Sequence, residues 1–219
     1  MNQQSKKLAR VSIVASVVLL VLGCASTGLM ASDDDLSLRS DPVAVKATLV
    51  KSFKYSEQAG PDRLDQTEDQ HACTEHAVKP LSADRIAALE KAALAAIKYP
   101  ADGNYLGDWK KGQKLAIGGT GMTYRDKPGS RVDGNCYACH QLETAEVSYG
   151  TIGPSLNNYG KKRGNSDAIL KYTWSRLWNS HAYKACNPMP RFGAAGILSE
   201  SDLKDIMALL HDPASVVNQ

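Results

Sequence analysis

The stretch "DGNCYACHQLE", residues 133–143, decides how the rest of the chain is interpreted. It separates Cys136 and Cys139 by two residues and follows the second cysteine directly with His140. A single C-x-x-C pair is compatible with a metal site, a redox-active dithiol or a covalent attachment point. The remaining sequence has to discriminate among these three chemistries.

Two of the three chemistries lack supporting residues elsewhere. A structural zinc site needs four ligands, usually supplied as two pairs. The other cysteines, Cys24, Cys73 and Cys186, are single and far apart. A thioredoxin-like dithiol begins a helix directly after a buried strand, and nothing strand-like precedes Cys136. Both alternatives are therefore weak.

The third chemistry accounts for the order of the residues. C-x-x-C-H is the attachment signature of haem c, in which two thiols bond to the vinyl groups and the next residue gives the iron an axial imidazole. One helical turn would space the sulfurs of Cys136 and Cys139 to the vinyl positions and bring His140 beneath the iron. One such motif predicts one haem c.

Met189 is the predicted second axial ligand of the haem iron. It lies in "CNPMPRFG" (186–193), where two flanking prolines hold the backbone extended and let a loop present the sulfur rigidly. Met207 falls in a helical apolar stripe, which favours packing, and Met122 precedes the attachment motif. Cys186 remains a rival as a thiolate ligand. A thioether raises the reduction potential relative to a thiolate, which suits an electron acceptor.

The segment "IGPSL" (152–156) offers a partner for the ligand histidine. The carbonyl of Pro154 could accept the Nδ1 proton of His140, which would fix the orientation and tautomer of the ring. The alternative is a turn proline without that contact.

The N-terminal residues predict export. Basic residues precede an uncharged, largely apolar run over 11–22, and small residues follow it, so residues 1–23 resemble a signal peptide. "VLGC" (21–24) is similar to a bacterial lipobox, which would make Cys24 the lipid-carrying first residue of the mature chain. Ordinary cleavage nearer Ala31 is the alternative. We therefore expect a periplasmic protein that could carry a lipid anchor to the membrane.

Export changes the expectations for charge and for cysteine chemistry. The formal net charge of the full chain is +3. The signal peptide itself carries +3, from Lys6, Lys7 and Arg10, because no acidic residue occurs before Asp33. Its removal would leave a mature chain with no net charge. A neutral mature chain predicts no nucleic-acid partner.

Disulfides persist outside the cytosol. Cys73 and Cys186 are therefore a candidate disulfide, with two unpaired thiols as the alternative.

The chain beyond the signal peptide has a helical pattern. Four segments are predicted helices, and glycine-rich loops separate them: 82–99, 107–119, 166–180 and 199–212. Residues 42–55 could hold a short strand, 56–76 and 150–164 have the composition of loops, and no fold is assigned to 33–80.

The attachment motif, the G-P-S-L segment, the proline-flanked methionine and an amphipathic terminal helix together resemble a class I cytochrome c. The resemblance covers residues 107–211. It implies an all-α, class I cytochrome c fold over 107–219, preceded by a partly helical N-terminal extension over 24–106.

Four segments together resemble a narrower group, the SoxX family. Its members are the monohaem subunits of the SoxAX cytochromes of bacterial sulfur oxidation. The four segments are "GNCYACH" (134–140), "GTIGPSLNNYG" (150–160), "MPRFG" (189–193) and "LSESDLKDIMALLHDP" (198–213). That resemblance implies a heterodimer with a SoxA-type cytochrome, which joins thiosulfate oxidatively to a cysteine of the SoxYZ carrier protein. The chain would accept electrons through a His/Met haem and pass them to a downstream cytochrome.

In that role the chain is the electron-transfer subunit of an L-cysteine S-thiosulfotransferase and is not catalytic alone. The alternative is a free monomeric periplasmic shuttle that serves an oxidase or reductase. A haem sensor or peroxidase would need an open coordination site, which a Met189 ligand argues against.

Overall fold

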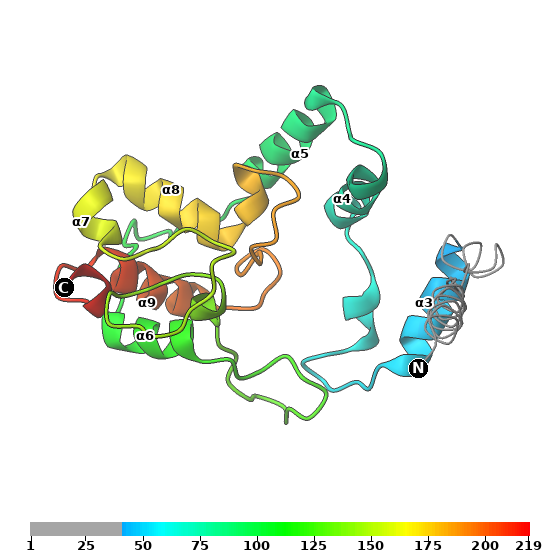
Figure 1. Cartoon of the computed structure of the whole chain (residues 1–219), viewed down its shortest axis with the longest axis horizontal. Helices are drawn as coiled ribbons and strands as arrows, with labels where there is room; N and C mark the ends of the chain where they lie inside the picture. Colours follow the sequence, from blue (N-terminus) through cyan, green and yellow to red (C-terminus); the bar gives the residue numbers. More distant parts are fainter. Residues whose placement is uncertain (1–40) are drawn as a thin grey trace, which may run out of the picture. The chain divides into compact units, whose positions relative to one another are not determined.

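The structure is a computed structural model that describes residues 41–219 (Figure 1). The predicted signal peptide and Cys24 lie outside the described residues. The chain divides into two units, residues 1–52 and residues 53–219. Helices, turns and loops account for all of residues 41–219, so the all-α prediction is confirmed there. None of the helices in this range is long and apolar enough to cross a lipid bilayer.

The first unit contributes α3 (Pro42–Ser52), where the sequence allowed a short strand. Pro42 occupies the first helical position, and the Asp41 carboxylate accepts a hydrogen bond from the backbone N–H of Val43 at 2.9 Å. These start signals outweigh the β-propensity of the valines and threonine that follow. The strand prediction for 42–55 is therefore wrong.

The second unit contains six α-helices and four short 3-10 turns between residues 53 and 219: η2 (Pro61–Leu64), α4 (Glu68–Val78), α5 (Ala83–Ala95), α6 (Trp109–Ile117), η3 (Cys136–Ala138), α7 (Tyr159–Arg163), α8 (Asp167–Trp178), η4 (Ser180–Ala182), α9 (Glu200–His211) and η5 (Val216–Asn218). The helices α5, α6, α8 and α9 lie within the four predicted segments. Ser82 caps α5 and Ser199 with Asp202 forms a capping box at α9, as their spacing predicted.

The helix α4 occupies a segment that the sequence analysis assigned to a loop. Thr67 and Gln70 form a capping box at its start, and the Gln70 side chain accepts a hydrogen bond from the Thr67 N–H at 2.9 Å. Ala72 is its one buried residue, so the helix shows almost no apolar periodicity. The loop prediction for 56–76 is wrong for this reason, and the predicted loop 150–164 likewise contains the short helix α7.

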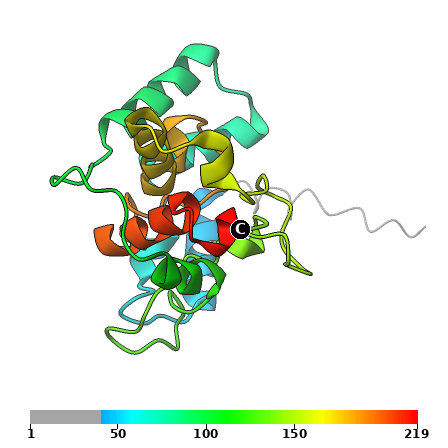
Figure 2. The same cartoon turned by 90° about the vertical axis from the view of Figure 1, so that its left-hand side faces the viewer.

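The core of the second unit forms where α6 packs against α9, and the two helices lie side by side in both views (Figures 1 and 2). Gly112 permits this close approach, because an ideal Cβ there would lie 2.0 Å from the carbonyl oxygen of Asp205. Leu203 and Met207 of α9 are fully buried, so Met207 has the packing role that its place in the stripe predicts.

Trp174 of α8 joins part of the predicted extension to this core. Its indole N–H donates a hydrogen bond to the carbonyl oxygen of Lys98 at 2.8 Å, and its side chain is fully buried. Residues 53–106 thus belong to the same compact unit as residues 107–219.

Candidate functional site

The C-x-x-C-H motif is built on a single 3-10 turn, η3. The backbone N–H groups of Cys139 and His140 both donate to the carbonyl oxygen of Cys136, at 3.0 and 2.9 Å. Asn135 precedes the turn in the left-handed region, with φ 47°, which asparagine tolerates better than most residues. The turn therefore places both thiols and the imidazole within one helical turn, the spacing that the motif predicted.

Both thiols of the motif are free. Cys136 packs against the hydrophobic core, and burial raises the pKa of its thiol to about 12. The sulfur of Cys136 is therefore held as a neutral thiol beside the core. Cys139 is half-buried.

His140 has a defined orientation. Its Nδ1 lies 2.7 Å from the carbonyl oxygen of Pro154, the contact that the sequence analysis predicted. A protonated Nδ1 donates this hydrogen bond and leaves Nε2 with its lone pair, which is the tautomer a metal ligand requires.

The loop that carries Pro154 is fastened to the motif along its length. The N–H of Gly153 donates to the carbonyl oxygen of Cys139 at 2.8 Å, and the N–H of Gly150 donates to that of Tyr137 at 3.0 Å. Gly153 lies against the imidazole, because an ideal Cβ there would lie 2.1 Å from Cε1 of His140. Neither glycine was predicted as part of the site, although both stand in the sequence beside the proline with G-x-x-G-P spacing.

The backbone of Met189 is held from both sides. Its carbonyl oxygen accepts a hydrogen bond from the hydroxyl of Ser180 at 2.6 Å, and its N–H donates to the Asn187 side chain at 3.0 Å. Ser180 is fully buried, and the Met189 side chain packs partly buried against the core. The loop therefore holds the backbone that carries the Met189 thioether.

The structure joins Cys73 of α4 to Cys186 of the Met189 loop by a disulfide, with the sulfurs 2.10 Å apart. The sequence left a disulfide and two unpaired thiols as alternatives for these cysteines, and the structure shows the disulfide. A bridged sulfur is not a thiolate, so Cys186 as the rival axial ligand is wrong.

A second link between α4 and the Met189 loop was not predicted. The Asp69 carboxylate lies 2.6 Å from the guanidinium of Arg191 and 3.2 Å from Nδ1 of His181. Burial alone would raise the pKa of Asp69, but the hydroxyl of Thr67, the guanidinium and the imidazole outweigh it, and the pKa is lowered. Asp69 is therefore an ionised carboxylate between two basic side chains.

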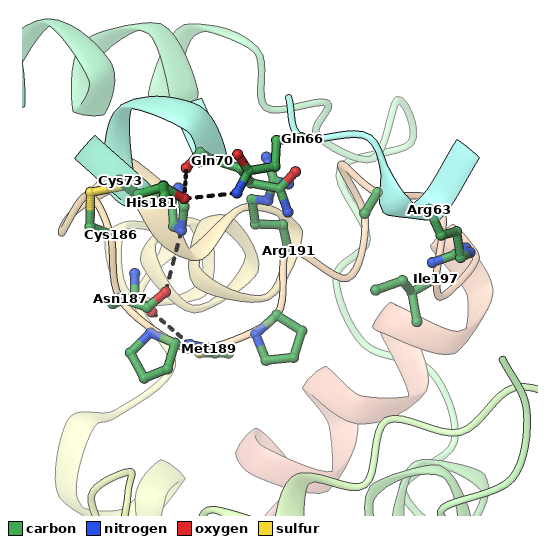
Figure 3. A pocket seen from close by; sticks show the side chains of 14 residues that line it. Arg63, Gln66, Gln70, Cys73, His181, Cys186, Asn187, Met189, Arg191 and Ile197 are labelled. Carbon is green, nitrogen blue, oxygen red and sulfur yellow. Dashed lines mark hydrogen bonds between the residues drawn. A yellow bond between two sulfur atoms is a disulfide. The ribbon is translucent and has the colours of Figure 1, made fainter. Parts of the chain in front are cut away.

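A cavity of about 460 Å³ lies between α4 and the Met189 loop (Figure 3). Polar side chains line much of its wall, among them Arg63, Gln66, Gln70 and Arg191, and Met189 with its two flanking prolines forms part of the wall. The close-up shows His181 and the disulfide on the same wall. The cavity thus borders the Met189 loop and shares no lining residue with the C-x-x-C-H turn.

The donor set of the described residues fits haem c. Two free thiols lie one turn apart, a histidine with an occupied Nδ1 follows them, and a thioether is held on a braced loop. Within residues 41–219, no three or more His, Cys, Asp or Glu side chains gather into a metal-ligand cluster, so the zinc alternative finds no ligand set in this part of the chain.

Comparison with known proteins agrees with this donor set. Residues 127–212 match the cytochrome c family, whose members bind haem c covalently and transfer electrons through its iron. An uncharacterized lipoprotein of Aquifex aeolicus (strain VF5) is 34% identical over 203 residues, which cover 91% of this chain and 93% of that protein. The chain therefore belongs to the same protein family as the Aquifex lipoprotein, and its residues 127–212 are a cytochrome c domain.

Proposed function

We propose that the chain carries electrons through a single haem c that Cys136 and Cys139 hold covalently and that His140 and Met189 ligate. The observation that carries this proposal is the 2.7 Å contact between Nδ1 of His140 and the Pro154 carbonyl, which leaves Nε2 free to ligate iron. The bound haem supplies a centre that gains and loses one electron.

The protein residues favour electron transfer over ligand binding or catalysis at this centre. Met189 belongs to a loop whose backbone is hydrogen-bonded on both sides, and this arrangement would favour retention of its thioether as a ligand of the haem. A thioether and a neutral imidazole also leave the iron with little compensating negative charge, which favours the reduced state and a high potential.

We further propose that the chain is the electron-accepting subunit of a SoxAX-type complex. The support is the resemblance of its four segments, at 134–140, 150–160, 189–193 and 198–213, to SoxX. Coupling thiosulfate to a cysteine thiol of SoxYZ forms a sulfur–sulfur bond and releases two electrons and one proton. A single haem accepts one electron at a time, so the SoxA-type partner or a downstream cytochrome must take the other.

The same proposal places the protein outside the cytosol. The signal-like residues 1–23 and the name of the Aquifex relative, a lipoprotein, support export and lipidation at Cys24. A lipid at Cys24 would hold the electron carrier near the membrane, where respiratory acceptors lie.

The axial ligands are tested on the full chain, matured with haem. Ferric haem with methionine sulfur bound to its iron has a weak charge-transfer band in the red. We expect this band in the wild-type protein, its loss in Met189→Ala and its retention in Met122→Ala, the matched control from the loop before the motif. A wild-type spectrum without the band, or a band that survives in Met189→Ala, would overturn the ligand assignment.

The complex is tested by co-expression with a SoxA-type cytochrome. We expect the two chains to co-purify and the haem of this chain to become reduced when thiosulfate and SoxYZ are added.

A free electron shuttle is the second candidate, because all the proposed haem-holding residues come from this one chain. Isolation as a monomer, with no thiosulfate-dependent reduction in the presence of the SoxA-type protein, would favour the shuttle.

A further inference from the structure

The loop that carries Met189 has little regular structure of its own. It runs from η4 to Arg191, and two prolines in it provide no N–H donors. Its local hydrogen bonds include the Ser180 and Asn187 contacts of Met189 and two contacts from the Asn187 amide to the carbonyl oxygens of Ser180 and Lys184. Such a loop needs contacts from outside to keep one position.

One outside contact comes from α5, where the Glu90 carboxylate accepts a hydrogen bond from the N–H of Ala185 at 3.0 Å. The contacts nearest to Met189 come from α4, which lies before the cytochrome c match at 127–212. The disulfide from Cys73 fastens Cys186, three residues before Met189. Cys186 itself has a φ of 59°, in the left-handed region, which residues with a Cβ other than asparagine and aspartate rarely adopt. The bridge holds the loop in a conformation that its own backbone does not favour.

Asp69 provides the second fastening, one helical turn before Cys73. It binds Arg191, two residues after Met189, and His181, whose Nε2 lies 3.3 Å from the carbonyl oxygen of Asn187. The Arg191 side chain is only 16% exposed, so this ion pair is screened less than a surface pair. The Cys73–Cys186 bridge and the Asp69 carboxylate thus bind the loop before and after Met189.

We infer that α4 is a brace for the axial methionine, in which Asp69 and the Cys73–Cys186 bridge position Met189 and set how readily its sulfur leaves the haem iron. Asp69 and the bridge are positioning elements, because they act on Met189 only through the loop. The inference rests on the proposed function, since it takes Met189 as the axial ligand.

A brace predicts a specific kinetic effect. An external ligand such as imidazole can bind ferric iron only after methionine leaves, so its saturating binding rate reports the rate of methionine release. We expect Asp69→Asn to raise this rate about tenfold, because a partly buried, charge-assisted hydrogen bond to Arg191 is lost. We expect the double variant Cys73→Ser/Cys186→Ser to raise it at least as much. Asp69→Glu, which keeps the charge, should lie between Asp69→Asn and wild type.

The matched control is Asp102→Asn. Asp102 also pairs with a cation, Lys204 at 3.1 Å, but that cation belongs to α9 and not to the Met189 loop. The control should exchange imidazole at the wild-type rate. Melting temperatures of all variants are measured in parallel, because a purely structural role for Asp69 would lower the melting temperature without changing methionine release far below it.

The outcomes separate this inference from the proposed function. If the red charge-transfer band is present in wild type and lost in Met189→Ala, the ligand assignment holds. Under that condition, release rates in Asp69→Asn and in the double cysteine variant that equal the Asp102→Asn rate would overturn the brace. If the double variant does not fold, the single variant Asp69→Asn decides the question alone. If wild type lacks the band, the axial assignment itself fails.

Discussion

Nδ1 of His140 lies 2.7 Å from the carbonyl oxygen of Pro154. A hydrogen bond from the far nitrogen of an axial imidazole makes the ring a stronger donor and fixes its orientation. The acceptor is a backbone atom, so a change of side chain at position 154 does not remove it. The geometry depends more on Gly153, which lies against the ring.

The first prediction concerns Gly153→Ala. The new Cβ would lie 2.1 Å from Cε1 and 2.5 Å from Nδ1 of His140, so the ring must move and its hydrogen bond must lengthen. A weaker bond makes imidazole a poorer donor, stabilises ferric iron less and raises the midpoint potential. We expect a rise of roughly 30 to 60 mV, up to one tenfold change in a one-electron equilibrium constant.

The measurement is a spectroscopic redox titration of the haem-loaded fraction. Gly119→Ala is the control, because its Cβ would meet only the Asn135 side chain, at 3.5 Å or more. A potential equal to that of the control in fully loaded Gly153→Ala protein would show that this contact does not tune the ligand.

The second prediction separates the two cysteine pairs. Haem that is bound through thioethers stays with the chain on a denaturing, reducing gel. We expect the wild type and Cys73→Ser/Cys186→Ser to retain haem under these conditions, and Cys136→Ala/Cys139→Ala to lose it. Haem staining or peroxidase activity of the gel band checks this. Haem loss from the Cys73/Cys186 variant alone would reverse the roles assigned to the two pairs.

The sequence could predict the parts of the fold whose signals are local. The helices α8 and α9 combine apolar spacing with caps or breakers at their ends, and their predicted ranges contain the observed ones. Once Cys136 and Cys139 were assigned to haem, Cys73 and Cys186 could be predicted as a candidate disulfide, and the structure decides for the bridge over two unpaired thiols. The contact of Pro154 with His140 could be predicted because His140 belongs to a known motif and the G-P-S-L segment downstream offers a backbone carbonyl as its partner.

The rest could not be predicted because its signals were polar or distant. The helix α4 buries only Ala72, so it has no apolar stripe, and its visible signals were the Thr67–Gln70 capping box and the acidic first turn. Asp69 binds Arg191 across 122 residues of sequence, and nothing local in either segment marks such a pair. The helix α4 and its ion pair with the methionine loop therefore became visible only in three dimensions.

The third prediction tests the contact between α6 and α9. Alanine is favoured over glycine inside a helix by about 1 kcal/mol, but a Cβ at position 112 would lie 2.0 Å from the carbonyl oxygen of Asp205. Because that atom belongs to backbone, the helices must separate. We expect Gly112→Ala to lower the free energy of unfolding by about 3 kcal/mol and the melting temperature by about 10 °C.

Thermal unfolding followed by circular dichroism measures this effect, again with Gly119→Ala as the control. The helical propensity of alanine predicts stabilisation, and the helix contact predicts the opposite. A variant more stable than wild type would mean that α6 and α9 do not approach as closely as described.

The last prediction concerns His211, at the end of α9. Its side chain is 1% exposed, with Nδ1 2.9 Å from the Asn165 side chain and Nε2 3.1 Å from the Thr173 hydroxyl. Burial lowers its pKa from 6.5 to about 4. The folded state therefore holds neutral histidine, while the unfolded state takes up a proton below pH 6.5. The stability from His211 is complete above pH 6.5 and is lost as pH falls towards 4, a change on the order of 3 kcal/mol.

Denaturant unfolding between pH 7.5 and 4.5 tests this, with wild type compared with His211→Gln. Glutamine has a donor and an acceptor but does not titrate, so the variant should lose less stability than wild type as pH falls. His71→Gln is the control, because that side chain is 66% exposed. Apart from position 211, the titratable side chains of wild type and His211→Gln are identical, so their contributions cancel in the difference. Parallel pH curves for wild type and His211→Gln would therefore show that His211 is protonated alike in the folded and unfolded states, against the burial seen here.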